Sequence, residues 1–90
     1  STNPLNLNMA AEWVNESVEV RVDFCGKRVV PRAMHWNSKL YPISNVNMIH
    51  STHEGSRKLF FFSVSDKTNY FKLQLDTDNL EWKLIEMYSG

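Results

Sequence analysis

Apolar and polar residues alternate along most of this chain, and the clearest alternation runs from Lys58 to Asp76. Apolar side chains occupy every second position in both halves of this stretch: Phe60, Phe62 and Val64, then Phe71, Leu73 and Leu75. The polar run between them, residues 65–69, is typical of a turn. The pattern predicts a β-hairpin. Its apolar face is too large to leave in water, so we expect other strands to cover it.

Four further segments have the composition of strands: Ser17–Phe24, Arg28–Trp36, Leu40–Ile49 and Leu80–Tyr88. Pro31 lacks a backbone donor, which places its strand at a sheet edge or predicts a bulge there. The third segment is expected to break near Pro42. The last segment has apolar residues on both faces near its end, which predicts a bulge or a two-sided environment. The polar run Ser51–Ser56 is expected to be the longest loop.

The expected fold is therefore mostly β, an antiparallel meander of five or six strands curled toward a small barrel. Residues 1–8 are expected to form a flexible arm, and residues 9–90 a single small domain. Met9–Val14 is expected to form a short N-terminal helix capped by Asn8. The predicted core consists of Val18, Val20, Val22, Met34, Trp36, Ile43, Phe60, Phe62, Val64, Phe71, Leu73, Leu75, Trp82 and Leu84.

Composition narrows the class of protein. The apolar share of 42% is too high for a disordered chain. Ten basic and ten acidic residues cancel, so no overall field attracts the chain to nucleic acid or to an anionic membrane. No apolar run reaches the roughly 18 residues of a membrane span, so no membrane association is expected. The single cysteine, Cys25, indicates a reducing compartment and a cytoplasmic location.

Basic and aromatic residues alternate in the middle of the chain. Lys27, Arg28, Arg32 and Lys39 lie within thirteen residues, with Trp36 and Tyr41 between and beyond them, and Arg57 and Lys58 precede the hairpin. Small β-domains bind single-stranded nucleic acid by stacking bases on aromatic rings in a basic groove. Arg32 and Trp36 share strand parity and are expected on one face. The competing interpretation places Trp36 in the core, with Arg32 at its rim.

Phe61 is the one ring of the Phe60–Phe62 run that points away from the predicted core. Either Trp13 of the N-terminal helix covers it, or it contacts another molecule. An uncovered apolar surface of this kind marks an interface with a protein partner or with a second copy of the chain. The oligomeric state is expected to be a monomer or a homodimer.

Reactive side chains are few. His50, His53 and Glu54 could hold a divalent metal, but this spacing on an extended chain does not direct both imidazoles to one side. Cys25 is expected to be a semi-buried, inert thiol. The sequence contains no cofactor motif and no catalytic constellation, so it predicts no enzyme, no cofactor and no metal site.

The order of motifs also carries a resemblance. Val18-x-Val-x-Val leads to a turn at Gly26, Pro31 precedes Trp36, and the chain closes on Asp76, Trp82, Leu84 and Tyr88. Over residues 17–88 this order is similar to a family of small bacterial β-domains of unknown function that end on Asp-x(5)-Trp-x-Leu. The turn after Trp36 lacks the glycine of that family. Some members are associated with error-prone DNA polymerases, so the resemblance implies a DNA-repair context. It implies no site residue.

Taken together, the sequence favours a non-catalytic binding or accessory module that acts through a protein partner. The alternative is a module that binds single-stranded nucleic acid. The candidate binding residues are Arg32, Trp36, Lys39, Tyr41, Arg57, Lys58 and Phe61.

Overall fold

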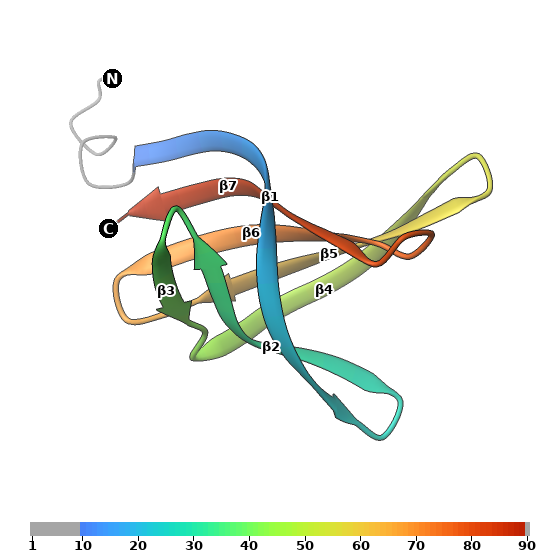
Figure 1. Cartoon of the computed structure of the whole chain (residues 1–90), viewed down its shortest axis with the longest axis horizontal. Helices are drawn as coiled ribbons and strands as arrows, with labels where there is room; N and C mark the ends of the chain where they lie inside the picture. Colours follow the sequence, from blue (N-terminus) through green and yellow to red (C-terminus); the bar gives the residue numbers. More distant parts are fainter. Residues whose placement is uncertain (1–9, 90) are drawn as a thin grey trace.

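The computed structural model describes residues 10–89, and in this part of the chain every regular element is a β-strand (Figure 1). The strands are β1 (Ala10–Cys25), β2 (Arg28–Trp36), β3 (Lys39–Pro42), β4 (Asn45–Glu54), β5 (Arg57–Ser65), β6 (Asn69–Asp76) and β7 (Glu81–Ser89). They form one open sheet in the order β3-β2-β1-β7-β6-β5-β4. Every ladder is antiparallel, as the alternating sequence pattern predicted.

Three finer predictions are wrong. The sheet has seven strands rather than five or six, and it is open rather than curled into a barrel. Ala10–Val14 was expected to be helical but belongs to β1, where it pairs with β7. A helix of this length is marginal in water, whereas a neighbouring strand supplies a full set of backbone partners. Met9 and the expected arm, residues 1–8, lie outside the described residues.

The long strand β1 bends (Figure 1), and its two halves have different partners. Its first half pairs with β7 and its second half with β2. The ladder with β7 shifts register between Trp13 and Glu16, and Asn15 there has a φ of 53°. Asparagine tolerates this left-handed conformation better than most residues do. Past the bend, β2 and β3 lie across the strands of the other half (Figure 1).

The third predicted strand is two strands, as its expected break indicated. β3 and β4 stand at opposite edges of the sheet, yet only residues 43 and 44 connect them. The Ile43 amide donates to the Arg32 carbonyl at 2.8 Å, and the Ser44 amide donates to the Ser65 carbonyl at 2.9 Å. These bonds hold the β2–β3 hairpin against the end of β5. The predicted loop at Ser51–Ser56 is wrong, because β4 continues to Glu54 and turns only at Gly55 and Ser56.

Two predicted irregularities are confirmed. Pro31 pairs with Val22 and Ala33 pairs with Arg21, so Arg32 between them is the extra residue of a bulge. In β7, the ladder with β6 shifts so that Ile85 has no direct partner there. A bulge accommodates the missing proline donor in one case and a change of apolar face in the other.

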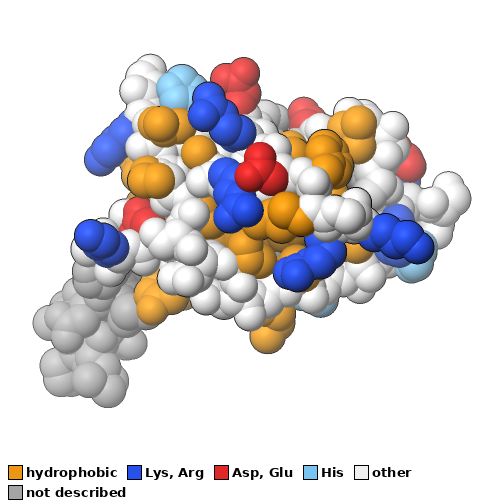
Figure 2. All heavy atoms as spheres, turned by 90° about the horizontal axis from the view of Figure 1, so that it is seen from below, with side chains coloured by type: hydrophobic (Ala, Val, Ile, Leu, Met, Phe, Trp, Pro, Cys, Tyr) orange, Lys and Arg blue, Asp and Glu red, His pale blue; other side chains and the backbone are white. Residues whose placement is uncertain are grey.

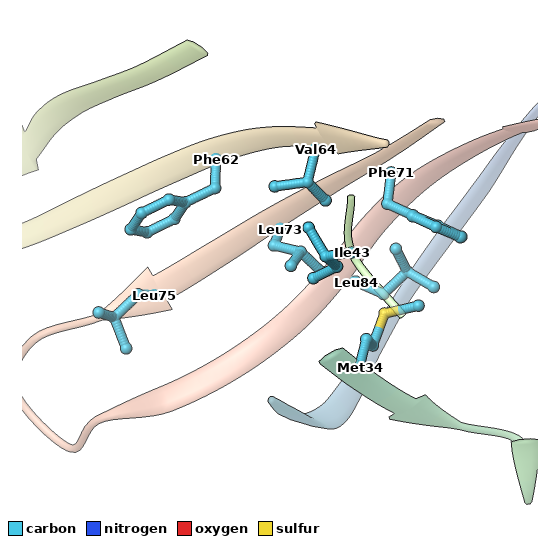
Figure 3. Close-up of a cluster of buried hydrophobic side chains, with 8 residues drawn as sticks. All are labelled: Met34, Ile43, Phe62, Val64, Phe71, Leu73, Leu75 and Leu84. Atoms are coloured by element: carbon cyan, nitrogen blue, oxygen red, sulfur yellow. The ribbon is translucent and has the colours of Figure 1, made fainter. Parts of the chain in front are cut away.

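The core lies between the two halves of the sheet. It contains Met34, Ile43, Phe62, Val64, Phe71, Leu73, Leu75 and Leu84, and all eight were predicted (Figure 3). Val18, Val20, Trp36, Phe60 and Trp82, also predicted, are partly buried against this cluster. Leu59 and Ile85 are buried as well and were not predicted.

Candidate binding surfaces

One side of β4 to β7 presents aromatic and sulfur-containing side chains away from the core. His50 of β4 pairs with Phe61 of β5. One row of paired residues crosses four strands and consists of Met48, Ser63, Lys72 and Glu86. Trp13 of β1 extends that row. We call this surface the Phe61 face, and it comprises Trp13, Met48, His50, Phe61, Tyr70 and Tyr88, with Lys72 and Glu86 among them.

The Phe61 face is open to solvent in the part of the chain that the structure describes. Trp13 is 68% exposed, Met48 60% and Tyr70 49%. An open groove of about 550 Å³ runs between β4 and β7, with Met48, Tyr70 and Tyr88 among its lining residues. The predicted cover by an N-terminal helix is wrong, since Trp13 lies in β1 and is itself exposed.

Local contacts order the side chains of this face. The rings of His50 and Phe61 stack with centroids 5.2 Å apart, and the Lys72 ammonium lies 5.5 Å from the Phe61 ring. The Tyr88 hydroxyl donates to Glu86 at 2.7 Å, and this hydrogen bond raises the pKa of Tyr88. These contacts position the rings of Phe61 and Tyr88 on the face.

Two of the residues predicted to bind nucleic acid, Arg32 and Trp36, are hydrogen-bonded to carboxylates. Arg32, at the bulge, donates through Nε to Asp23 at 2.8 Å. Trp36 donates through Nε1 to Glu16 at 3.0 Å and packs on the core. The cation therefore has a carboxylate partner, and the indole is held at the rim of the core. The interpretation of Trp36 as a core residue fits this arrangement better than a free stacking platform.

Lys39 and Tyr41 remain neighbours of Trp36. The ring of Tyr41 lies 6.0 Å from that of Trp36 and 5.4 Å, edge on, from that of Phe71. The Lys39 ammonium lies 5.2 Å from the Tyr41 ring. Tyr41 thus joins the exposed end of β3 to the core.

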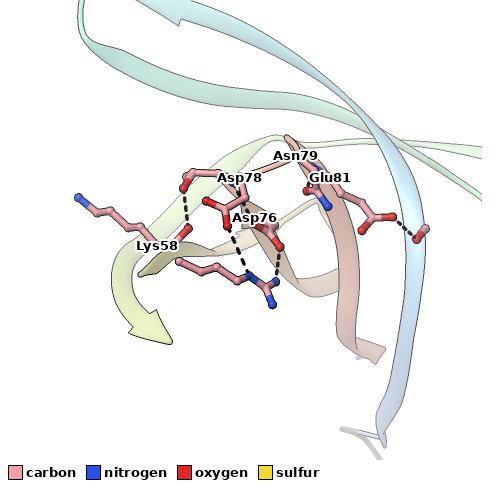
Figure 4. Close-up of polar contacts among 8 residues, drawn as sticks. Lys58, Asp76, Asp78, Asn79 and Glu81 are labelled. Carbon is pink, nitrogen blue, oxygen red and sulfur yellow. Dashed lines mark hydrogen bonds and ion pairs between the residues drawn. The ribbon is translucent and has the colours of Figure 1, made fainter. Parts of the chain in front are cut away.

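Arg57 and Lys58 lie at the start of β5. Figure 4 shows Lys58 beside the turn between β6 and β7, which carries Asp78 and Asn79. Arg57 forms an ion pair with the nearly buried Asp76 and reaches Asp78 at 3.9 Å. A hydrogen bond from the Asp78 amide, together with the Arg57 guanidinium, lowers the pKa of Asp76. Arg57 is therefore a structural cation of the turn.

Lys58 is positioned by the same turn. Thr77 donates to the Lys58 carbonyl through its amide at 3.2 Å and through its hydroxyl at 2.8 Å. The Lys58 ammonium lies 5.0 Å from the ring of Phe60, on the inner side of the sheet. No carboxylate pairs with Lys58 among residues 10–89.

Phe60 belongs to a second surface, which we call the basic cleft. This hollow of about 200 Å³ lies between the β1–β2 turn and the inner side of β4 to β6, and its walls include Lys27, Arg28, Val29, Ile49, Phe60 and Phe62. The sequence grouped Lys27 and Arg28 with Trp36, their neighbour along the chain. Folding places them beside Phe60 instead, and no local pattern indicates that pairing.

The reactive side chains stay apart. His50 and His53 are three positions apart on β4, so they point to opposite faces. No group of three histidine, cysteine or acidic residues within the described range could hold a metal ion. Cys25 is exposed at the end of β1, so the expectation of a semi-buried thiol is wrong. None of the described residues forms a helix that could cross a membrane.

Comparison with known proteins adds no assignment. No family model matches the chain, and neither the curated proteins nor the solved structures include a match to it. The resemblance to small bacterial β-domains stays a prediction.

Proposed function

We propose that this domain is a non-catalytic binding module that recognises a protein partner through the Phe61 face. The observation that carries this proposal is the exposure of Trp13, Met48 and Tyr70 on one side of one sheet. Aromatic residues and methionine are enriched where proteins bind one another. Contiguous exposed apolar surface of this kind marks an interaction site.

The shape of the face favours binding over catalysis. Its groove is open, whereas a catalytic site excludes water and converges several polar groups on one point. The polar groups here contact the aromatic side chains instead. Glu86 accepts a hydrogen bond from the Tyr88 hydroxyl, and the Lys72 ammonium lies over the Phe61 ring.

The free edge of β4 supports a partner that binds in an extended conformation. β4 is ten residues long, ends the sheet, and carries one acidic residue, Glu54, at its last position. Natural edge strands are usually protected by lysine, proline, a very short length or a bulge; β4 has no lysine or proline and is not short, and its one irregularity is a register shift between Val46 and Met48. A partner strand added to β4 would place its alternate side chains beside Met48 and His50, on the Phe61 face.

The proposal predicts how the association responds to salt and to mutation. Burial of apolar surface is insensitive to ionic strength, in contrast to pairing of exposed charges. Tyr70→Ala removes an exposed aromatic anchor without opening the core. We expect it to raise the dissociation constant at least about tenfold, equivalent to about 1.4 kcal/mol.

Site-specific photocrosslinking in the native cell tests the proposal even though the partner is unidentified. A photoreactive phenylalanine derivative replaces Tyr70 in one variant and Leu80 in the control. Leu80 is 72% exposed in the β6–β7 turn, away from the face. We expect a discrete protein adduct only at position 70, and its mass distinguishes a different protein from a second copy of this chain. Equal adducts at both positions would contradict the proposal.

A further inference from the structure

The basic cleft combines two features that point to one kind of ligand. Its floor is apolar and aromatic, with Phe62 only 2% exposed and Phe60 partly exposed. Its rim is cationic, since Lys27 and Arg28 line one side and Lys58 lies over Phe60. Figure 2 shows lysine and arginine side chains around an exposed hydrophobic surface on the side of the molecule that it draws.

The cations of the rim are free to bind an anion. Across residues 10–89, Lys27, Arg28 and Lys58 form no ion pair with a carboxylate. Arg57 differs, because Asp76 and Asp78 already neutralise it. The turn that binds Arg57 also fixes the backbone of Lys58 through Thr77, and the Lys58 ammonium lies 5.0 Å from the ring of Phe60, which lines the cleft.

The size of the cleft indicates how much of a ligand enters it. Sites that enclose a whole small molecule measure about 300–1,000 Å³, so a cleft of about 200 Å³ holds only part of a ligand. The remainder must extend over the basic rim. The cleft therefore suits a ligand with a flat apolar group and negative charges on either side of that group. One base of a nucleic-acid strand, with its flanking phosphates, has this form.

We infer that the basic cleft binds single-stranded nucleic acid, with one base against Phe60 and the neighbouring phosphates on Lys27, Arg28 and Lys58. A duplex does not fit this role, because its bases are stacked and paired inside the helix. On binding, the base stacks on the Phe60 ring and displaces the Lys58 ammonium, which then pairs with a phosphate. The cation–π contact that is lost is weak.

The number of cations sets the expected salt dependence. For single-stranded nucleic acid, the logarithm of the association constant falls linearly with the logarithm of the salt concentration. The slope is about −0.7 for each phosphate that the protein neutralises. Three phosphates give a slope of about −2. Raising sodium chloride from about 50 to about 200 mM should therefore weaken binding about 20-fold.

Fluorescence anisotropy with a labelled strand of about ten thymidines measures this binding. We expect the double variant Lys27→Glu with Arg28→Glu to weaken binding at least about tenfold. Lys39→Glu with Lys67→Glu makes the same change of charge outside the cleft and should weaken it less than about twofold. All four positions are exposed, so the variants should keep the parent melting temperature. Equal losses in both double variants would overturn the inference.

Three ligands with the same protein test the place of the base. An abasic strand keeps the phosphates but cannot stack, so it should bind at least about fivefold more weakly than oligothymidine. A duplex should bind more weakly too, and polyglutamate should not compete. Equal affinity for the abasic strand, tighter binding to the duplex, or full competition by polyglutamate would each overturn the assignment in favour of a general polyanion surface. Amide shifts at Val29, Ile49 and Phe60 on titration would support it.

Discussion

Replacing Phe62 with alanine tests which side of β5 faces the core. Phe62 is 2% exposed, and its ring centroid lies 5.2 Å from that of Trp82. Truncating a buried phenylalanine costs about 3–5 kcal/mol, as lost transfer energy plus the energy of the cavity left behind. Phe62 also lines the basic cleft, so water can enter the new space. We therefore expect the lower end of the range, about 3 kcal/mol.

Phe61→Ala is the matched control, since it removes the same atoms one position along the strand. Phe61 is only partly buried, against His50 and Lys72 on the outer face. Its truncation should cost about 1 kcal/mol, because most of the space it leaves is open to solvent.

Urea unfolding followed by tryptophan fluorescence measures both variants. In a domain of this size, about 3 kcal/mol corresponds to a fall in melting temperature of about 12–24 °C. The slope of the free energy of unfolding against urea should stay unchanged, so that the midpoints report stability. A Phe61→Ala variant as unstable as Phe62→Ala would refute the assignment of faces.

Three further outcomes are expected. Asn15→Ala should be less stable than Asn15→Gly by about 1 kcal/mol in urea unfolding, because residue 15 has a φ of 53°; equal stability would contradict the bend. The pKa values of Asp76 and Asp66 are lowered in the folded state, so their ionised forms stabilise the fold. This contribution is complete above the ordinary carboxyl pKa and is lost as the pH falls through the folded-state pKa values. Asp76→Asn should therefore flatten the acid limb of the urea midpoint against pH; an unchanged limb would count against the ion pair. In a double-mutant cycle, Trp36→Phe and Glu16→Ala should couple by about 1 kcal/mol, and strict additivity would argue against their hydrogen bond.

The sequence predicted strand parity well, for a local reason. In β5 and β6, each core residue alternates with a residue on the other face, so Phe62 and Leu73 could be assigned from their neighbours alone. The bulge at Pro31 was also predictable, since proline cannot donate to a ladder. These signals lie within a few residues of the feature that they indicate.

The pairing of β1 with β7 could not be predicted from neighbouring residues. Residues 10–14 have good helix formers in Ala10, Ala11 and Glu12, and only the distant strand β7 makes them extended. The basic cleft was missed for the same reason. Lys27 lies near Trp36 along the chain, but the fold places it beside Phe60. Contacts between distant segments decide both outcomes.

The alternation of side chains along β5 has a consequence for how the domain could work. Phe61 points to the outer face, whereas Phe60 and Phe62 point to the inner side. Ligands on the two surfaces would be separated by the thickness of the sheet and would not compete. A domain with both proposed activities would act as an adaptor. It would raise the local concentration of the protein bound to one face near the nucleic acid bound to the other.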